Sequence, residues 1–115
     1  MSSFTPAGSG GLPPVPVTVD GLTVTTPSIA NVVIAAANTE ESYTLPANSR
    51  RFLILLRTPS VAKLQLAYAV GTSGTTYVTI NPGCHYSESE IDSPSVTLYF
   101  QSTLSGQVAE IVSWV

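Results

Sequence analysis

Cys84 and His85 are the residues best suited to metal binding or nucleophilic catalysis, and each is the only residue of its type in the 115-residue chain. A structural zinc site needs four ligands, so this pair could supply at most half of one. A Cys–His catalytic pair needs converging side chains, whereas neighbours in an extended chain point to opposite faces. The sequence therefore favours a structural role for both residues, in a turn that follows Asn81-Pro82-Gly83.

Glu88, Glu90 and Asp92 alternate along the chain, so an extended backbone would place all three carboxylates on one side. Such a group could bind a hard cation such as calcium, which takes oxygen ligands. The segment lacks the glycine and the ligand spacing of a known calcium loop, and like charges on a solvated loop explain it more simply. As a glycosidase pair the carboxylates would need a cleft and a buried acid, and nothing in the sequence indicates either.

The remaining composition argues against catalysis and against nucleic-acid binding. The chain has one histidine, no glycine-rich phosphate loop and no nucleophile elbow, so most acid–base schemes lack a base. We therefore expect no enzyme and no cofactor. The net charge is −3, and the four basic residues Arg50, Arg51, Arg57 and Lys63 are too few to neutralise a phosphate backbone.

Two acidic and two basic residues flank the turn at Pro46. Glu40 and Glu41 precede it, and Arg50 and Arg51 follow it. We interpret them as charges at the edge of a hairpin. The alternative is that these arginines and Arg57 form salt bridges between subunits.

The elements that would position these side chains are predicted to be strands. Short apolar segments rich in β-branched and aromatic residues alternate with turn signals at intervals of about 8–12 residues, and helix has little support. The predicted strands are 29–36, 41–45, 50–57, 61–69, 75–80, 95–102 and 107–114. A short break at Leu104-Ser105-Gly106 predicts that the last two form a hairpin. The predicted fold is an all-β, antiparallel two-sheet sandwich or jelly roll.

Two of the predicted strands are apolar on both faces. Leu64, Leu66 and Tyr68 alternate with other residues in the manner of a half-buried strand, but 52–56 is apolar throughout, and 108–115 carries apolar residues on each side. A strand of a two-sheet domain needs one apolar face for the core. The second face then has to meet the N-terminal segment, a loop or another subunit, and we favour a subunit contact.

Residues 1–28 differ in composition from the rest, with five prolines and four glycines. Such a segment favours extended backbone and cannot build a core of its own. We therefore divide the chain into an extended N-terminal arm, 1–28, and a β-sandwich domain, 29–115. Val15, Val17 and Val19 alternate, so the arm could add a strand to the sheet edge of another subunit.

Three segments together resemble small virion structural proteins of tailed bacteriophages, of the capsid decoration or cement type. The resemblance covers roughly 30–115, and it is carried by 37–52, by 63–68 with 74–80, and by 96–101 with 108–114. It implies a non-enzymatic β-domain bound to the virion. It carries over no catalytic residue, and it leaves capsid, neck and tail positions open.

We therefore expect a cement protein that binds the outer surface of the phage head, after assembly in the host cytoplasm, and stabilises the shell. The expected partners are two further copies in a homotrimer and the major capsid protein, with no nucleic acid, membrane or small-molecule substrate. The alternatives are a head–tail connector and a receptor- or carbohydrate-binding module of a tail. The residues predicted to contact other subunits or the capsid are Phe4, Leu12, Val15, Val17, Val19, Arg50, Arg51, Leu53, Leu55, Arg57 and Trp114.

Overall fold

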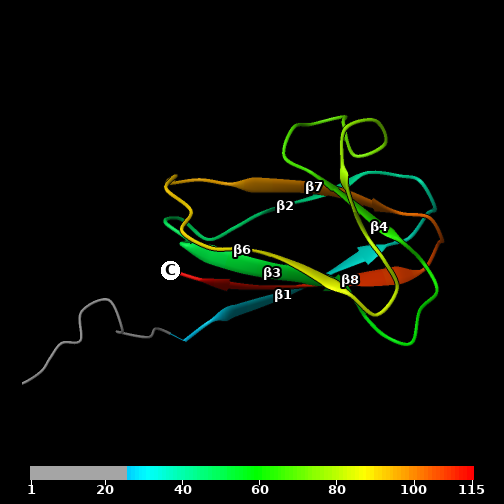
Figure 1. The fold of residues 1–115 in the computed structure, drawn as a ribbon, viewed down its shortest axis with the longest axis horizontal. Helices are drawn as coiled ribbons and strands as arrows, with labels where there is room; N and C mark the ends of the chain where they lie inside the picture. Colours follow the sequence, from blue (N-terminus) through cyan, green and yellow to red (C-terminus); the bar gives the residue numbers. More distant parts are fainter. Residues whose placement is uncertain (1–25) are drawn as a thin grey trace, which may run out of the picture.

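The computed structural model describes residues 26–115, which form eight β-strands in two antiparallel sheets of four (Figure 1). The strands are β1 (Ser28–Ile34), β2 (Glu41–Thr44), β3 (Arg51–Leu56), β4 (Leu64–Ala67), β5 (Val78–Ile80), β6 (His85–Glu88), β7 (Thr97–Ser102) and β8 (Gln107–Trp114). The described residues contain no helix. The prediction of an all-β, antiparallel two-sheet fold is thus confirmed.

The strand order is nested about the middle of the chain. One sheet has the order β1-β8-β3-β6 and the other has the order β2-β7-β4-β5. Strand β1 therefore pairs with β8, β2 with β7, β3 with β6 and β4 with β5, all antiparallel. The chain crosses between the sheets at most of its connections, so long-range pairing holds both sheets together.

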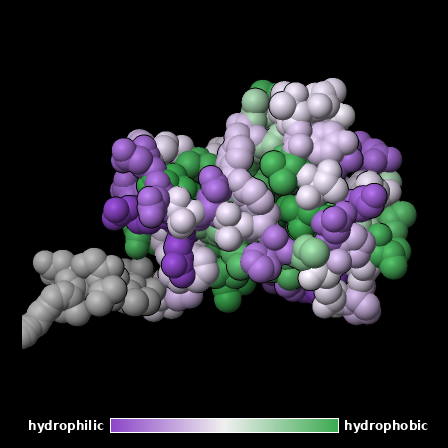
Figure 2. Space-filling view, viewed as in Figure 1, coloured by the Kyte–Doolittle hydropathy of each residue, from purple (hydrophilic) through white to green (hydrophobic). Residues whose placement is uncertain are grey.

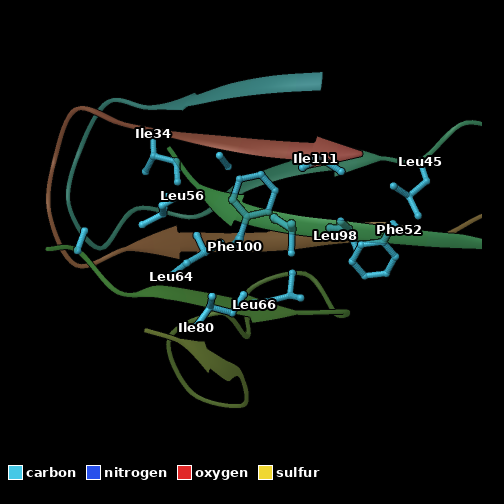
Figure 3. Close-up of a cluster of buried hydrophobic side chains, with 13 residues drawn as sticks. Ile34, Leu45, Phe52, Leu56, Leu64, Leu66, Ile80, Leu98, Phe100 and Ile111 are labelled. Atoms are coloured by element: carbon cyan, nitrogen blue, oxygen red, sulfur yellow. The ribbon is translucent and has the colours of Figure 1, made fainter. Parts of the chain in front are cut away.

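The core lies between the two sheets, where each strand turns its apolar residues inward (Figure 3). In β3 the residues Phe52, Ile54 and Leu56 are buried, and in β7 the residues Leu98 and Phe100 are fully buried. The alternation along each strand follows from the two-residue period of an extended backbone. The β4 residues Leu64 and Leu66 close the core from the second sheet.

The predicted hairpin of the last two strands is wrong. Strand β7 pairs with β2 and β4, whereas β8 pairs with β1 and β3 in the other sheet. Both Phe100 and Ile111 are buried, so the two strands face one another across the core instead of lying side by side. The break at 103–106, with Gly106 at a φ of 70°, carries the chain from one sheet to the other.

The sequence does not predict strand β6 (His85–Glu88), because its residues fit a turn followed by a charged loop. It is the edge strand that pairs with β3, and its one large apolar contribution to the core is Tyr86. An edge strand with a single inward aromatic carries little hydrophobic periodicity. The predicted strands 61–69 and 75–80 are also shorter in the structure, at Leu64–Ala67 and Val78–Ile80.

The predicted arm, 1–28, lies almost entirely outside the described residues, and so do its candidate contact residues Phe4, Leu12, Val15, Val17 and Val19. The described part of the chain enters β1 at Ser28, close to the predicted boundary.

Candidate interaction surface

The outer face of the β1-β8-β3-β6 sheet brings together apolar residues from three strands. Residues directly opposite each other in antiparallel strands share a face. The register aligns Ile29, Val112 and Leu53 in one row, and it pairs Val33 with Val108 in another. Between these rows, Leu55 and Asn31 flank Glu110. We call this set, together with Arg51, Arg57 and Trp114, the apolar sheet face.

Several side chains on the apolar sheet face are open to solvent. Ile29 is 71% exposed and Val33 is 61% exposed, while Leu53, Leu55, Val108 and Val112 are half-buried by their neighbours on the sheet. Large exposed apolar residues grouped on one face are typical of a contact surface. Figure 2 shows hydrophobic and near-neutral residues between hydrophilic groups at the left and right of the visible surface.

The outer face of the β2-β7-β4-β5 sheet has a different chemistry. Its outward residues are almost all neutral and polar: Ser42, Thr44, Gln65, Thr79, Thr97, Tyr99 and Gln101. Thr44 and Thr97 share a hydrogen bond of 2.9 Å between their hydroxyls. This face is therefore well suited to contact with water, whereas the apolar sheet face is not.

Trp114 and Arg51 form one end of the apolar sheet face. They are opposite each other in the register, and the Arg51 guanidinium carbon lies 4.3 Å from the centroid of the indole ring. A cation over an indole is attracted to the ring at an exposed site by about 0.5–1 kcal/mol. Arg50 contributes its backbone instead, because its N–H donates to the Trp114 carbonyl oxygen at 2.6 Å and its carbonyl oxygen accepts from Ile91 N–H.

Arg57 lies at the opposite end of β3 and is paired within the chain. Its Nε donates to Glu110 Oε2 at 2.6 Å. The predicted salt bridge to another subunit is therefore not needed to satisfy this arginine. The pair also leaves the centre of the apolar sheet face without net charge.

The predicted charge pairing across the turn at Pro46 is wrong. Strands β2 and β3 lie in different sheets, so the flanking charges do not meet across a hairpin. The Glu40 carboxylate instead accepts hydrogen bonds from Gly71 N–H (2.7 Å), Ser73 N–H (3.1 Å) and Ser73 Oγ (2.5 Å). The Ser73 hydroxyl and the Gly71 amide hold the pKa of Glu40 below its ordinary value.

The residues first considered for metal binding do not converge. No group of three or more His, Cys, Asp or Glu side chains within residues 26–115 is arranged to hold a metal ion. Glu90 has a φ of 60°, which breaks the extended backbone that would have aligned it with Glu88 and Asp92. Cys84 is an exposed free thiol in the turn before β6, and His85 opens that strand.

Sequence reasoning missed a group of tyrosines that the fold brings together. Tyr68 and Tyr77 lie nine residues apart and both line one shallow depression of about 490 Å³, together with Leu66, Ala67, Ala69, Thr72, Thr76 and Val78. Tyr68 also borders a second depression of about 250 Å³ with Phe52, Glu88, Ser89, Glu90, Ile91 and Val96. No local pattern in the sequence groups these tyrosines, because it does not show which strands become neighbours.

Comparisons with known proteins give no further guide to identity. Neither a scan against family models nor searches of curated proteins and of solved structures found a match. Within residues 26–115 there is no helix that is long and apolar enough to cross a membrane.

Proposed function

We propose that this protein is a non-enzymatic virion structural protein, a capsid decoration or cement protein of a tailed bacteriophage. The observation that carries the assembly part of this proposal is the contrast between the two outer faces of the sandwich. One is neutral and polar, and the other exposes Ile29 and Val33 beside four more apolar residues. The virion part rests on the sequence resemblance.

The nested strand order supports the same proposal. The orders β1-β8-β3-β6 and β2-β7-β4-β5 are those expected of an eight-stranded jelly roll. Viral capsid proteins and lectins both use this architecture, so the fold is compatible with a virion role without specifying it.

In the proposed assembly, three copies bury their apolar sheet faces against one another. The Arg57–Glu110 pair is neutralised within each chain, so apposed copies do not bring like charges together at that point. The N-terminal arm, 1–28, would then bind neighbouring subunits or the capsid. Contacts made only in the assembled state stabilise that state by mass action, and the shell would resist internal pressure better.

The native mass of the full-length protein, measured by light scattering on a sizing column, tests the assembly. We expect a trimer. We also expect Val33→Glu to give a monomer with an unchanged circular dichroism spectrum, because Val33 is exposed in the isolated chain and a charge there opposes burial. Thr79→Glu is the matched control, since it places the same charge on an exposed strand residue of the other sheet.

A wild-type protein that is monomeric at high concentration, or a Val33→Glu variant that remains trimeric, would contradict the assembly. Binding to purified heads that lack decoration protein tests the virion part separately. Heads that bind no wild-type protein would contradict the capsid role even if the trimer forms.

The alternative position is a head–tail connector. The same sandwich could assemble into a ring, and a native mass of six or twelve chains would favour that position over decoration.

A further inference from the structure

Two depressions lie beside Tyr68, which lines both of them, and we call the two together the tyrosine cleft. Tyr77 and residues of the 69–76 loop line the larger depression, and Glu88 and Glu90 line the smaller one. Tyr68 is 48% exposed and Tyr77 is 41% exposed, so both rings present surface to solvent while their inner parts pack. The larger depression is in the size range of small-molecule sites.

Tyr68 is held in a fixed position at the centre of the tyrosine cleft. Its ring meets Phe52 edge-on, with centroids 6.5 Å apart and planes at 72°. Its hydroxyl lies 3.5 Å from that of Tyr86. Partial burial, then the Tyr86 hydroxyl and the Glu88 carboxylate, raise the pKa of Tyr68 far above its ordinary value, so the phenol stays protonated. Its O–H is directed at the Tyr86 hydroxyl, and its oxygen can accept a hydrogen bond from a ligand.

The loop that carries the other wall is also held in place. Gly71 and Ser73 donate to the Glu40 carboxylate, and Ser73 is buried. Thr72 and Thr76 form backbone hydrogen bonds within the loop, to Ala69 and to Thr72 respectively. Because this loop is already ordered, it loses little conformational entropy when a ligand binds, and the binding free energy is more favourable for that reason.

The polar groups of the tyrosine cleft define the ligand chemistry. Its hydrogen-bonding side chains are hydroxyls of Tyr, Thr and Ser and the carboxylates of Glu88 and Glu90, and none of the described residues that line it is Lys or Arg. An anionic ligand would therefore meet only like charge. Tyrosine faces offer flat apolar surface, and the hydroxyls and carboxylates can exchange hydrogen bonds with a ligand rich in hydroxyl groups.

We propose that the tyrosine cleft is a binding site for neutral carbohydrate. One sugar ring stacks on Tyr77, and the Tyr68 hydroxyl and the Glu88 and Glu90 carboxylates bind hydroxyls of the next ring. The inference is independent of the capsid role, because the cleft does not include the apolar sheet face. On a virion, such a site would allow the particle surface to bind polysaccharide.

The test uses the full-length protein on an array of neutral oligosaccharides, with sialylated and sulfated glycans on the same array. The strongest neutral hit is then titrated by calorimetry. We expect binding to neutral glycans only. Tyr77→Ala should weaken it about tenfold, the loss expected for one stacked aromatic, and Tyr77→Trp should retain it. Tyr99→Ala is the matched control and should bind like wild type, because Tyr99 lies on the polar outer face and lines neither depression.

Backbone amide NMR spectra of each variant verify that the fold is intact, and shifts on titration locate the ligand. Absence of any neutral hit for the wild-type protein would overturn the proposal. So would a preference for anionic glycans, or equal losses in Tyr77→Ala and Tyr99→Ala.

Discussion

Single residues in this protein support the fold through specific polar contacts, and Glu40 is the clearest case. Its carboxylate receives three hydrogen bonds from the loop that follows β4, although the two segments are 31 to 33 residues apart. The Ser73 hydroxyl also lies 3.1 Å from Gln101 Oε1, so the same serine links the loop to β7. One side chain thereby fixes a wall of the tyrosine cleft.

We expect Glu40→Gln to lower the free energy of unfolding at pH 7 by about 0.5–1 kcal/mol, a value reduced for the partial exposure of the carboxylate. The folded pKa of Glu40 lies below its ordinary value of 4.5. Its contribution is therefore complete above pH 4.5 and is lost as the pH falls through the folded pKa. Urea unfolding at pH 7 and at pH 3 measures the difference, which should shrink in acid.

Glu41→Gln removes the same charge one residue further along and serves as the control. If both variants lost equal stability at pH 7, the effect would be one of net charge and not of the Glu40 hydrogen bonds.

At the scale of elements, the connections determine which sheet each strand joins. The turn between β2 and β3 moves the chain from one sheet to the other within six residues, 45–50. Ser49 is buried, and both its N–H and its Oγ donate to the Pro46 carbonyl oxygen, at 3.2 Å and 2.7 Å. Asn48 takes a φ of 63° in this turn, a region that asparagine and glycine tolerate better than other residues.

Asn48→Ala should therefore lower the free energy of unfolding by about 1 kcal/mol, because alanine pays the steric cost of the left-handed region. Asn48→Gly should stay within about 0.5 kcal/mol of wild type, since glycine enters that region freely but loses more chain entropy on folding. Thermal and urea unfolding of the three proteins gives the comparison. An alanine variant more stable than the glycine variant would contradict this account of the turn.

At the scale of the whole molecule, the two outer faces differ while the core between them is shared. The polar residues on the outer face of one sheet can form hydrogen bonds with water. On the apolar sheet face, exposure of Ile29 and Val33 to water is unfavourable in free energy. With only 10% charged residues, the chain has little other means of keeping that face solvated. Association of copies through this face is the simplest way to remove the apolar area from water.

If association stabilises the fold, the melting temperature must depend on protein concentration. Raising the concentration from about 1 to about 100 µM should raise the melting temperature of the wild-type protein by about 5 °C or more. Val33→Glu should melt at one temperature across that range. Scanning calorimetry at both concentrations measures this, and a wild-type melting temperature that does not change would argue against a stable oligomer.

The sequence alone was sufficient for the class of fold and for the inward faces of most strands. The alternation in 97–102 distinguishes the buried residues from the more exposed ones, because neighbouring residues of an extended chain point to opposite sides. In the strand at 64–67 the alternation is right for Leu64 and Leu66, but Ala67 is also buried and Tyr68 is 48% exposed. The doubly apolar character of 52–56 likewise indicated an apolar outer face, where the half-buried Leu53 and Leu55 lie. These are local properties, so they can be read without knowing the partners of a strand.

Only the tertiary structure decided which strands are neighbours. Strands β7 and β8 are adjacent in sequence but lie in different sheets, and β6 is a strand chiefly because β3 offers it a partner. The same long-range pairing placed Tyr68 beside Tyr77 in one depression and beside Glu88 in another, and it separated Glu40 from Arg50. Strand pairing depends on many contacts between segments that are distant in sequence, so a local pattern of residues cannot predict it.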